Sequence, residues 1–390
     1  MSSSRTNGGT AKPIGSRVWP WSPRFWHGMR TSVWLSLLRR NRLRVSPSRW
    51  VMAGIITFFS PLNSGLALVQ RGLYGRRLRQ RQIEHDPIFV IGHWRSGTTL
   101  LHELLVLDER FTYPDSYAVF APDHFLVSAW LLKPLLWPLI PSHRPMDNML
   151  SAWHLPQEDE FALCTMGLRS PYNTIAFPNE PPQDQHYLTF DRVAPDEVAA
   201  WQAGLLDFVK RITLRSGKPP VLKSPPHTGR VRVLLELFPR ARFVHISRDP
   251  TVLFASTVNL WKRLYETQGL QHPRFEGLEE HVLDSLERMY AAYERDRLTV
   301  PHGQLCEIRY EDLVAQPLEI MRRVYDEIEL SDFDAVRPKL QAYFAAKADY
   351  KTNKYSLSPQ WRDEVARRWA GYAERFGYVH EDHAASGAAR

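Results

Sequence analysis

The stretch GHWRSGTTLL at residues 92–101 constrains the fold of this chain more than any other feature of the sequence. It follows the apolar run PIFVIG at 87–92, which predicts a buried strand, and it leads into a helix expected over about 98–107. Gly92 and Gly97 have the GxxxxG spacing of loops in which backbone amides and a helix N-terminus bind phosphate. The stretch therefore predicts an anion-binding loop between a strand and a helix, with an incidental helix cap as the alternative.

This loop differs from that of an NTPase at one position. In NTPases the second glycine is followed by Lys and then Ser or Thr, whereas Thr98 and Thr99 follow Gly97 here. Without the lysine the loop cannot reach β and γ phosphates in the usual manner. Arg95 supplies positive charge from within the loop instead, and the hydroxyls of Ser96, Thr98 and Thr99 can donate to anionic oxygens.

The remainder of the chain repeats the strand-loop-helix unit, because short apolar runs alternate with helical stretches. Such alternation is typical of a parallel sheet covered by helices. We therefore predict an α/β fold: a P-loop-like parallel sheet flanked by helices, with a helical insertion and a basic N-terminal extension. Further strands are expected at 220–223, 242–247 and 305–309, and helices after them at 227–238, 250–265 and 317–328.

Charge divides the chain into a leader and a body. With 390 residues, 44% of them hydrophobic, the chain can bury a large core. Residues 1–83 contain 15 Lys or Arg and no Asp or Glu, so the remainder is mildly acidic although the whole chain carries +8. We expect a basic extension at 1–83, a main domain at 84–380 with a helical acceptor-side insertion at 117–219, and a flexible tail at 381–390.

The extension carries five tryptophans among its arginines, a combination that suits the headgroup layer of an anionic membrane. Residues 51–69 are largely apolar but contain Pro61, so a helix lying on the membrane is favoured over one that spans it. Packing against the domain and an organellar transit peptide are the alternatives. Nucleic acid is not expected as a partner, because no nucleic-acid-binding motif accompanies the charge. The tryptophans are Trp19, Trp21, Trp26, Trp34 and Trp50.

The loop resembles that of the sulfotransferases that use 3′-phosphoadenosine 5′-phosphosulfate (PAPS). Their 5′-phosphosulfate loop reads Lys or Arg, Ser, Gly, Thr, Thr, which RSGTT at 95–99 matches; the arginine is closer to the tyrosylprotein branch and its bacterial relatives than to the cytosolic enzymes. Their second motif, an Arg followed eight residues later by a Ser, is matched by Arg248 and Ser256. YEDL at 310–313 and TNKYSLS at 352–358 match further family elements, so the resemblance covers about residues 86–378.

The resemblance implies that PAPS is the co-substrate. No metal is expected, because no HExxH motif or Cys/His cluster suggests one and the transfer does not need one chemically. Arg248 and Ser256 would bind the 3′-phosphate, and Lys354 would lie in a lid over the nucleotide. Cations on the bridging oxygen assist such a transfer, with Arg95 as the first candidate and Lys223, at a strand end, as the second. The implied nucleotide-binding residues are Arg95, Ser96, Gly97, Thr98, Thr99, Leu100, Arg248, Ser256 and Lys354.

The general base is less constrained by sequence. Glu158 and Glu160 in PQEDEF lie close together, and clustered carboxylates repel enough to raise a pKa. The carbohydrate and tyrosylprotein branches have a glutamate shortly after the phosphate loop, which is absent here. His124, with an ordinary pKa near neutrality, and His227 are therefore further candidates, and a solvated helix start is the structural alternative for the carboxylates.

The leading interpretation is an enzyme that moves a sulfuryl group from PAPS to a hydroxyl, or less readily an amine, of a small-molecule or glycolipid-like acceptor. The Leu/Trp/Pro-rich insertion indicates that this acceptor is apolar. The alternatives are a degenerate P-loop nucleotide kinase or NTPase and a non-catalytic membrane-associated nucleotide-binding scaffold. Two distant cysteines, Cys164 and Cys306, exclude a disulfide scaffold and indicate a reducing compartment. We expect a cytoplasmic location, peripheral at the membrane.

Overall fold

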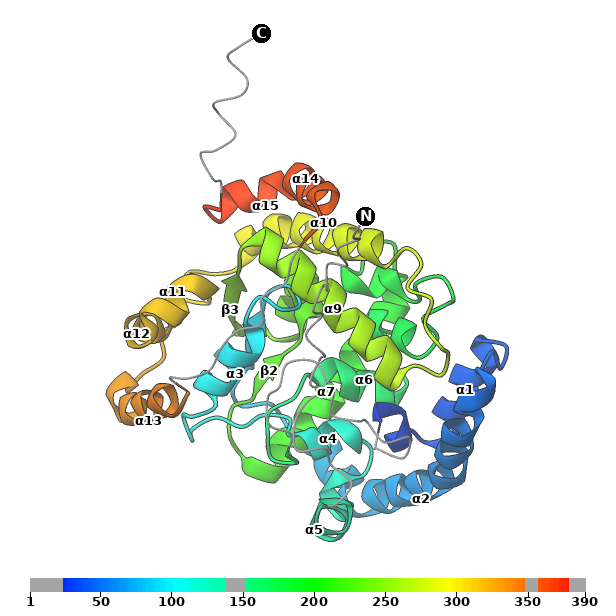
Figure 1. Ribbon diagram of the computed structural model, residues 1–390. Coiled ribbons are helices and arrows are strands. Elements are labelled where there is room, and N and C mark those ends of the chain that lie inside the picture. Colours follow the sequence, from blue (N-terminus) through cyan, green and yellow to red (C-terminus); the bar gives the residue numbers. More distant parts are fainter. Residues whose placement is uncertain (1–23, 138–151, 348–356, 379–390) are drawn as a thin grey trace, which may run out of the picture.

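The computed structural model describes residues 24–137, 152–347 and 357–378. Trp19, Trp21, Lys354 and the segment 381–390 lie outside the described residues, so what was predicted for them stays a prediction. Figure 1 shows a central sheet between layers of helices, with the helices α1 (Thr31–Arg40) and α2 (Trp50–Gln80) along one side.

Four parallel strands form the sheet, in the order β2, β1, β3, β4. They are β1 (Ile88–Ile91), β2 (Val221–Lys223), β3 (Arg242–Ser247) and β4 (Leu305–Arg309), at or within a residue or two of the predicted positions. The chain goes from β1 to one side of it for β2 and then to the other side for β3. Parallel sheets bind ligands at such a reversal, outside the carboxyl ends of the strands. The loop after β1 and the turn after β3 therefore meet where a ligand is expected.

Alternate strand residues face two separate cores, as the pleat of a strand requires. Ile88, Val90 and Val244 pack with one set of helices, while Phe89 and Phe243 belong to a larger core on the other face. The first set comprises α3 (Thr98–Leu105), α11 (Tyr310–Ala315), α12 (Pro317–Glu327) and α13 (Phe333–Ala346). The second comprises α7 (Pro195–Ser216), α8 (Val231–Leu237), α9 (Pro250–Gln268), α10 (Leu278–Asp296), α14 (Pro359–Arg368) and α15 (Ala370–Arg375). The predicted α/β sheet flanked by helices is confirmed.

The helix expected at 227–238 begins later than predicted. Pro225–Arg230 forms a 3-10 turn, and only then does α8 begin. Pro225 and Pro226 occupy the first positions of this 3-10 turn, where a missing N–H removes no hydrogen bond.

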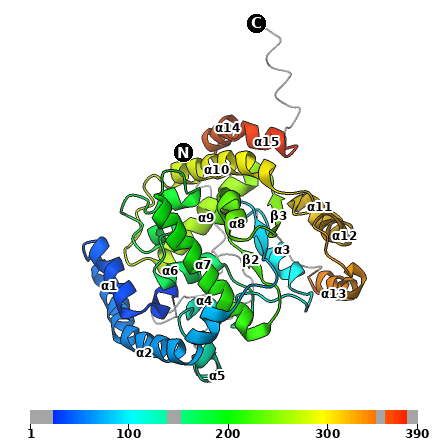
Figure 2. The same cartoon turned by 180° about the vertical axis from the view of Figure 1, so that it is seen from behind.

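The segment expected as the insertion, 117–219, is mostly helical where it is described. Its helices are α4 (Ser116–Phe120), α5 (Phe125–Leu136), α6 (Asp159–Met166) and α7, joined by the 3-10 turns Pro171–Ile175 and Gln185–Leu188. In Figure 2, which views the molecule from behind, α7 crosses the molecule near β2, with α6 close by. The N-terminal end of α6 thereby brings Glu158, its N-cap residue, to the carboxyl end of β2.

The first part of the N-terminal extension packs into the main core. Trp26 and Trp34 are completely buried in the same hydrophobic cluster as Phe89, and the Trp26 indole donates to the Gln268 carbonyl at 2.7 Å. The prediction that these tryptophans lie among lipid headgroups is therefore wrong for Trp26 and Trp34. The alternative, packing against the domain, describes this part of the extension.

Pro61 does not interrupt the apolar stretch, because α2 runs unbroken from Trp50 to Gln80. A proline inside a helix removes the hydrogen bond to the carbonyl four residues earlier, here that of Thr57. The Ser60 hydroxyl donates to that carbonyl at 3.2 Å and so replaces part of the loss. Length and composition would allow the helix Pro47–Gln80 to cross a membrane, because it contains an 18-residue window with a mean hydropathy of 1.5.

Candidate active site

The loop after β1 has a backbone that requires its glycines. Gly92 has φ +144°, and an added Cβ would lie 2.4 Å from the Ile246 carbonyl oxygen. Gly97 has φ +109°, and a Cβ there would lie 2.5 Å from the Tyr310 ring. Arg95 takes the left-handed conformation at φ +70°, which is uncommon for a residue other than glycine. This turn leads directly into α3, whose N-cap Gly97 makes no side-chain cap, so the first amides of the helix are open to an anion.

A buried hydroxyl in the same loop lacks a partner. The Ser96 hydroxyl oxygen is buried and accepts or donates no hydrogen bond within the described part of the chain. The loop itself is anchored, because the Gly92 amide donates to the Thr228 hydroxyl at 2.8 Å. An anchored loop with an unsatisfied hydroxyl is the arrangement expected where an oxygen atom of a ligand supplies the missing hydrogen-bond partner.

The two predicted nucleotide motifs meet at this loop. The Arg95 Nε donates to the Ser256 hydroxyl at 2.9 Å, and Arg248 Nη1 donates to the Arg95 carbonyl at 2.9 Å. The Arg248 guanidinium also lies over the Tyr310 ring, 4.1 Å from its centre, in a cation–π contact that fixes its direction. Residues more than 150 positions apart in the chain thus form one polar cluster.

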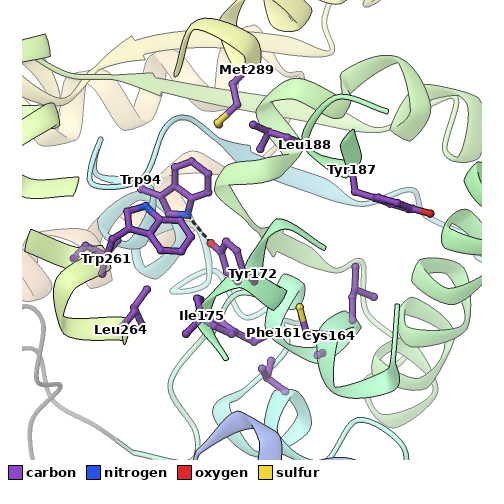
Figure 3. Packing of buried hydrophobic residues seen from close by; sticks show 14 of the residues in the cluster. Trp94, Phe161, Cys164, Tyr172, Ile175, Tyr187, Leu188, Trp261, Leu264 and Met289 are labelled. Carbon is purple, nitrogen blue, oxygen red and sulfur yellow. Dashed lines mark hydrogen bonds between the residues drawn. The ribbon is translucent and has the colours of Figure 1, made fainter. Parts of the chain in front are cut away.

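Lys223 and Glu158 form an ion pair beside the loop. Lys223 Nζ lies 2.7 Å from Glu158 Oε1 and 3.4 Å from the Thr99 hydroxyl, and its side chain is only 2% exposed. The other carboxylate oxygen, Oε2, accepts a hydrogen bond of 2.6 Å from the Tyr172 hydroxyl. Burial, followed by the Glu158 charge, raises the pKa of Tyr172 well above its ordinary value, so the phenol stays protonated and donates. Figure 3 shows that Trp94, from the loop, in turn donates to the Tyr172 oxygen, at 2.7 Å.

Glu160 does not face the loop, although it is only two residues from Glu158. Its carboxylate is bound by both terminal nitrogens of Arg230, at 2.6 and 2.9 Å, and both side chains are completely buried. The Ser170 hydroxyl donates to the same carboxylate. Arg230 also lies over the Trp201 ring at 4.8 Å. The cluster is a structural one, and the prediction of Glu160 as a base finds no support in these contacts.

His227, another candidate base, pairs with Asp159, the acidic residue between Glu158 and Glu160. Its Nε2 lies 2.7 Å from Asp159 Oδ2, and both side chains are 0% exposed. Burial alone would raise the pKa of Asp159, but the charge and hydrogen bond of His227 lower it overall. Its complete burial leaves His227 without access to an acceptor in this conformation.

His124 lies apart from these residues, at the start of α5. Its Nδ1 contacts the Ser128 hydroxyl at 2.8 Å, within its own helix, and its side chain is buried. Burial lowers the pKa of His124 to about 4. The contacts do not bring it to the loop, so the prediction of His124 as a base is likewise unsupported.

The profile of the sulfotransferase family matches residues 87–335. The ω-hydroxy-β-dihydromenaquinone-9 sulfotransferase Stf3 of Mycobacterium bovis, and that of Mycobacterium tuberculosis, are each 46% identical to this chain over 363 residues, which is 93% of both partners. The chain belongs to the sulfotransferase family. The predicted family and the predicted enzyme are confirmed, in place of the NTPase and scaffold alternatives.

Solved sulfotransferases share the fold. The sulfotransferase STF1 of Mycobacterium tuberculosis superposes with a TM-score of 0.62 at 19% identity, over 87% of this chain and 90% of the other. STF9 of Mycobacterium avium gives 0.58 at 17% identity, over 90% and 97%. The match of the Stf3 sulfotransferases over 93% of the chain includes most of the N-terminal extension, which the sequence motifs alone had left outside the resemblance.

Three residues that contact the predicted site residues were not identified from sequence. Tyr172 and Trp94 orient Glu158, and Tyr310 supports Arg248. Trp94 lies inside the loop motif and Tyr310 opens YEDL, so their positions were a signal for two of them. Nothing in the local sequence distinguishes Tyr172 from other buried aromatic residues, because its role depends on the tertiary placement of Glu158.

Proposed function

We propose that this sulfotransferase transfers a sulfuryl group from PAPS to a hydroxyl of an apolar, lipid-linked acceptor such as an ω-hydroxylated polyprenyl quinone. The observation that carries the reaction is the convergence of Arg95, Arg248 and Ser256 on one loop with the Lys223–Glu158 pair beside it. The acceptor class rests on the Stf3 relatives, whose name gives a hydroxylated menaquinone. An amine acceptor has no specific observation in its favour.

The donor site fits an anionic nucleotide. Two arginines, Arg95 and Arg248, lie within one polar cluster, where their like charges favour a polyanion between or beside them. Arg248 and Ser256 would hold the 3′-phosphate, while the loop amides and the hydroxyls of Ser96 and Thr99 would hold the 5′-phosphosulfate. Gly97, Thr98 and Leu100 would contribute backbone amides of the first turn of α3. A role for Lys354 in a lid stays a prediction.

The Lys223–Glu158 pair provides the acid–base chemistry of the transfer. The acceptor oxygen forms a bond to sulfur while the bond between sulfur and the bridging phosphate oxygen breaks, and that oxygen leaves with the electron pair. Glu158 would take the proton of the acceptor hydroxyl. Lys223 and Arg95 would stabilise the negative charge that develops on the bridging oxygen. Tyr172 would position the Glu158 carboxylate through its hydrogen bond.

We further infer a cytoplasmic location at the membrane surface. Cys164 and Cys306 are both free and buried, which suits a reducing compartment. A polyprenyl acceptor resides in a bilayer, so the enzyme has to reach its surface.

A transfer assay tests the proposed function. The purified chain is incubated with sulfur-35-labelled PAPS and a detergent-dispersed menaquinone carrying a terminal hydroxyl, beside the same quinone without it. The proposal expects label only in the hydroxylated quinone, and loss of transfer in Arg248→Ala. Absence of label in every hydroxylated polyprenyl acceptor would contradict the acceptor class. Absence of label in soluble alcohols and phenols as well would contradict sulfuryl transfer itself.

A further inference from the structure

The helix α2 carries apolar side chains on both of its faces. Its buried face mixes apolar residues such as Ile56 with polar ones: Asn63 Nδ2 donates to the carbonyls of His27 at 2.6 Å and Met29 at 3.0 Å, and Gln70 accepts from the Leu126 amide at 2.8 Å. A helix on the surface of a water-soluble protein normally has charged or polar residues on its outward face. The outward face of α2 is therefore not one that water would favour.

That outward face is a continuous apolar stripe. Its residues are spaced seven, four, seven and four positions apart, which places them on one side of a helix. Their exposure runs from 50% for Val69 to 77% for Phe58. The stripe comprises Val51, Phe58, Leu62, Val69 and Leu73.

The neighbouring helix α5 adds a second apolar surface. Figures 1 and 2 both show α5 beside α2, and the Gln70–Leu126 hydrogen bond joins them. Trp130 is 76% exposed, with Leu131 and Leu135 on the same helix also exposed. Large exposed apolar patches of this kind mark a surface that another apolar phase covers.

Positive charge flanks the stripe at its C-terminal end. Within the residues that the structure describes, no carboxylate pairs with the α2 arginines Arg71, Arg76, Arg77 or Arg79. A cavity of about 340 Å³ between α2 and α7 lies at the same end, lined by five cationic side chains against the carboxylates of Asp123 and Asp207. Unpaired arginines next to exposed apolar residues match a layer of anionic headgroups above acyl chains.

We propose that α2 and α5 dock this sulfotransferase on an anionic lipid bilayer, with the stripe in the acyl region and the α2 arginines at the phosphates. The inference rests on the proposed function for the reason why the enzyme would bind a membrane: an acceptor that resides in the bilayer has to enter the enzyme near this face. The surface itself is inferred from the side chains of α2 and α5. The helix lies along the surface and does not span the membrane. Spanning would expose Asn63 and Gln70 to lipid and break their hydrogen bonds to the rest of the chain.

Vesicle flotation of the full chain tests the docking surface. The vesicles are phosphatidylcholine alone and phosphatidylcholine with phosphatidylglycerol. We expect binding to both, with the anionic vesicles bound more tightly and the difference removed by salt. Phe58→Glu with Leu62→Glu should lower the affinity for both about tenfold or more, because each buries a charge in place of an apolar side chain. Arg76→Glu with Arg77→Glu should remove the preference for phosphatidylglycerol.

A matched control is Leu298→Glu, which alters an apolar side chain of 74% exposure on a different surface and should leave flotation unchanged. All three variants should keep the thermal unfolding midpoint of the native chain, since the substituted side chains are exposed. The docking proposal is overturned if the native chain ignores both vesicles, or if the Phe58 and Leu62 variant floats like the native chain. It is also overturned if that variant instead dissociates a dimer in the absence of lipid, which would assign the stripe to a second copy.

Turnover separates this inference from the proposed function. Transfer to a short-chain, water-soluble hydroxylated quinone should be equal in the native chain and the stripe variant. Flotation without any turnover would refute the proposed function and leave the docking proposal standing. Turnover without flotation would refute the docking proposal and leave the proposed function standing. Release of the native chain from membranes by alkaline carbonate is expected, and resistance to that treatment would contradict a surface position of α2.

Discussion

Glu158 and Glu160 are two residues apart, yet their surroundings predict opposite effects for the same isosteric change. Glu160→Gln removes a charge from a pair in which both side chains are completely buried and joined by two hydrogen bonds. Removing one partner of such a pair costs about 3–5 kcal/mol, because the Arg230 charge remains without compensation. With an unfolding entropy of about 2 cal/mol/K per residue, or about 0.8 kcal/mol/K for 390 residues, this lowers Tm by about 4–6 °C.

Glu158→Gln removes the proposed base. We expect kcat to fall by about 10²–10⁴-fold, the usual contribution of a positioned general base, while affinity for the nucleotide is kept. Some stability is also lost, because Lys223 is 2% exposed and loses a charged partner. Below its lower Tm, Glu160→Gln should keep kcat within a few-fold of the native value.

Thermal unfolding followed by circular dichroism and the PAPS transfer assay, performed on both variants, measure these effects. The reasoning is refuted if Glu160→Gln lowers kcat as strongly as Glu158→Gln while its Tm is unchanged. That outcome would mean that Glu160 reaches the acceptor and that the buried Arg230 charge does not need Glu160 for stability.

Three further predictions follow from the loop and the core. Lys223→Met should lower kcat about 10²-fold or more with little change in nucleotide affinity, as measured by steady-state kinetics and calorimetry, because it removes a cation from the bridging oxygen. Gly92→Ala should lower stability by about 2 kcal/mol or more and abolish nucleotide binding, since its Cβ would lie 2.4 Å from a backbone oxygen; an unchanged denaturation midpoint would contradict the loop geometry. Stability should be complete above about pH 6.5 and fall between about pH 6.5 and 3, because buried histidines with a lowered folded pKa take up protons only on unfolding. Denaturant titration across that range checks this, and a flat profile would contradict it. The histidines are His93, whose pKa burial lowers to about 3, and His124 and His245, whose pKa burial lowers to about 4.

The sheet and the nucleotide loop could be predicted from sequence because their signals are local. PIFVIG and RFVHIS are apolar runs next to a glycine or a turn residue, and both form strands at the predicted places. Gly92 is required by the nearby Ile246 carbonyl and Gly97 by the nearby Tyr310 ring, and the glycine spacing is visible without knowing those contacts.

The base could not be resolved from sequence, because its assignment depends on which side of α6 each carboxylate faces. Only two residues, about half a turn of helix, separate the carboxylate beside Lys223 from the one that binds Arg230. The position of the tryptophans in the N-terminal extension could not be predicted for a related reason. Tryptophan next to arginine suits both lipid headgroups and a protein core, and Trp26 and Trp34 pack inside, while the lipid-like face belongs to Phe58 and its neighbours.

Arg95, Arg248 and Ser256 converge on one loop, and nucleotide binding shows whether they form the donor site. Calorimetric titration with 3′-phosphoadenosine 5′-phosphate, beside ADP and ATP, should show tight binding of the 3′-phosphorylated nucleotide alone. Arg248→Ala should lose that binding while the unfolding midpoint stays close to the native value, since Arg248 is partly exposed. Equal or tighter binding of ATP, or binding of the 3′-phosphorylated nucleotide that Arg248→Ala leaves unchanged, would contradict the account.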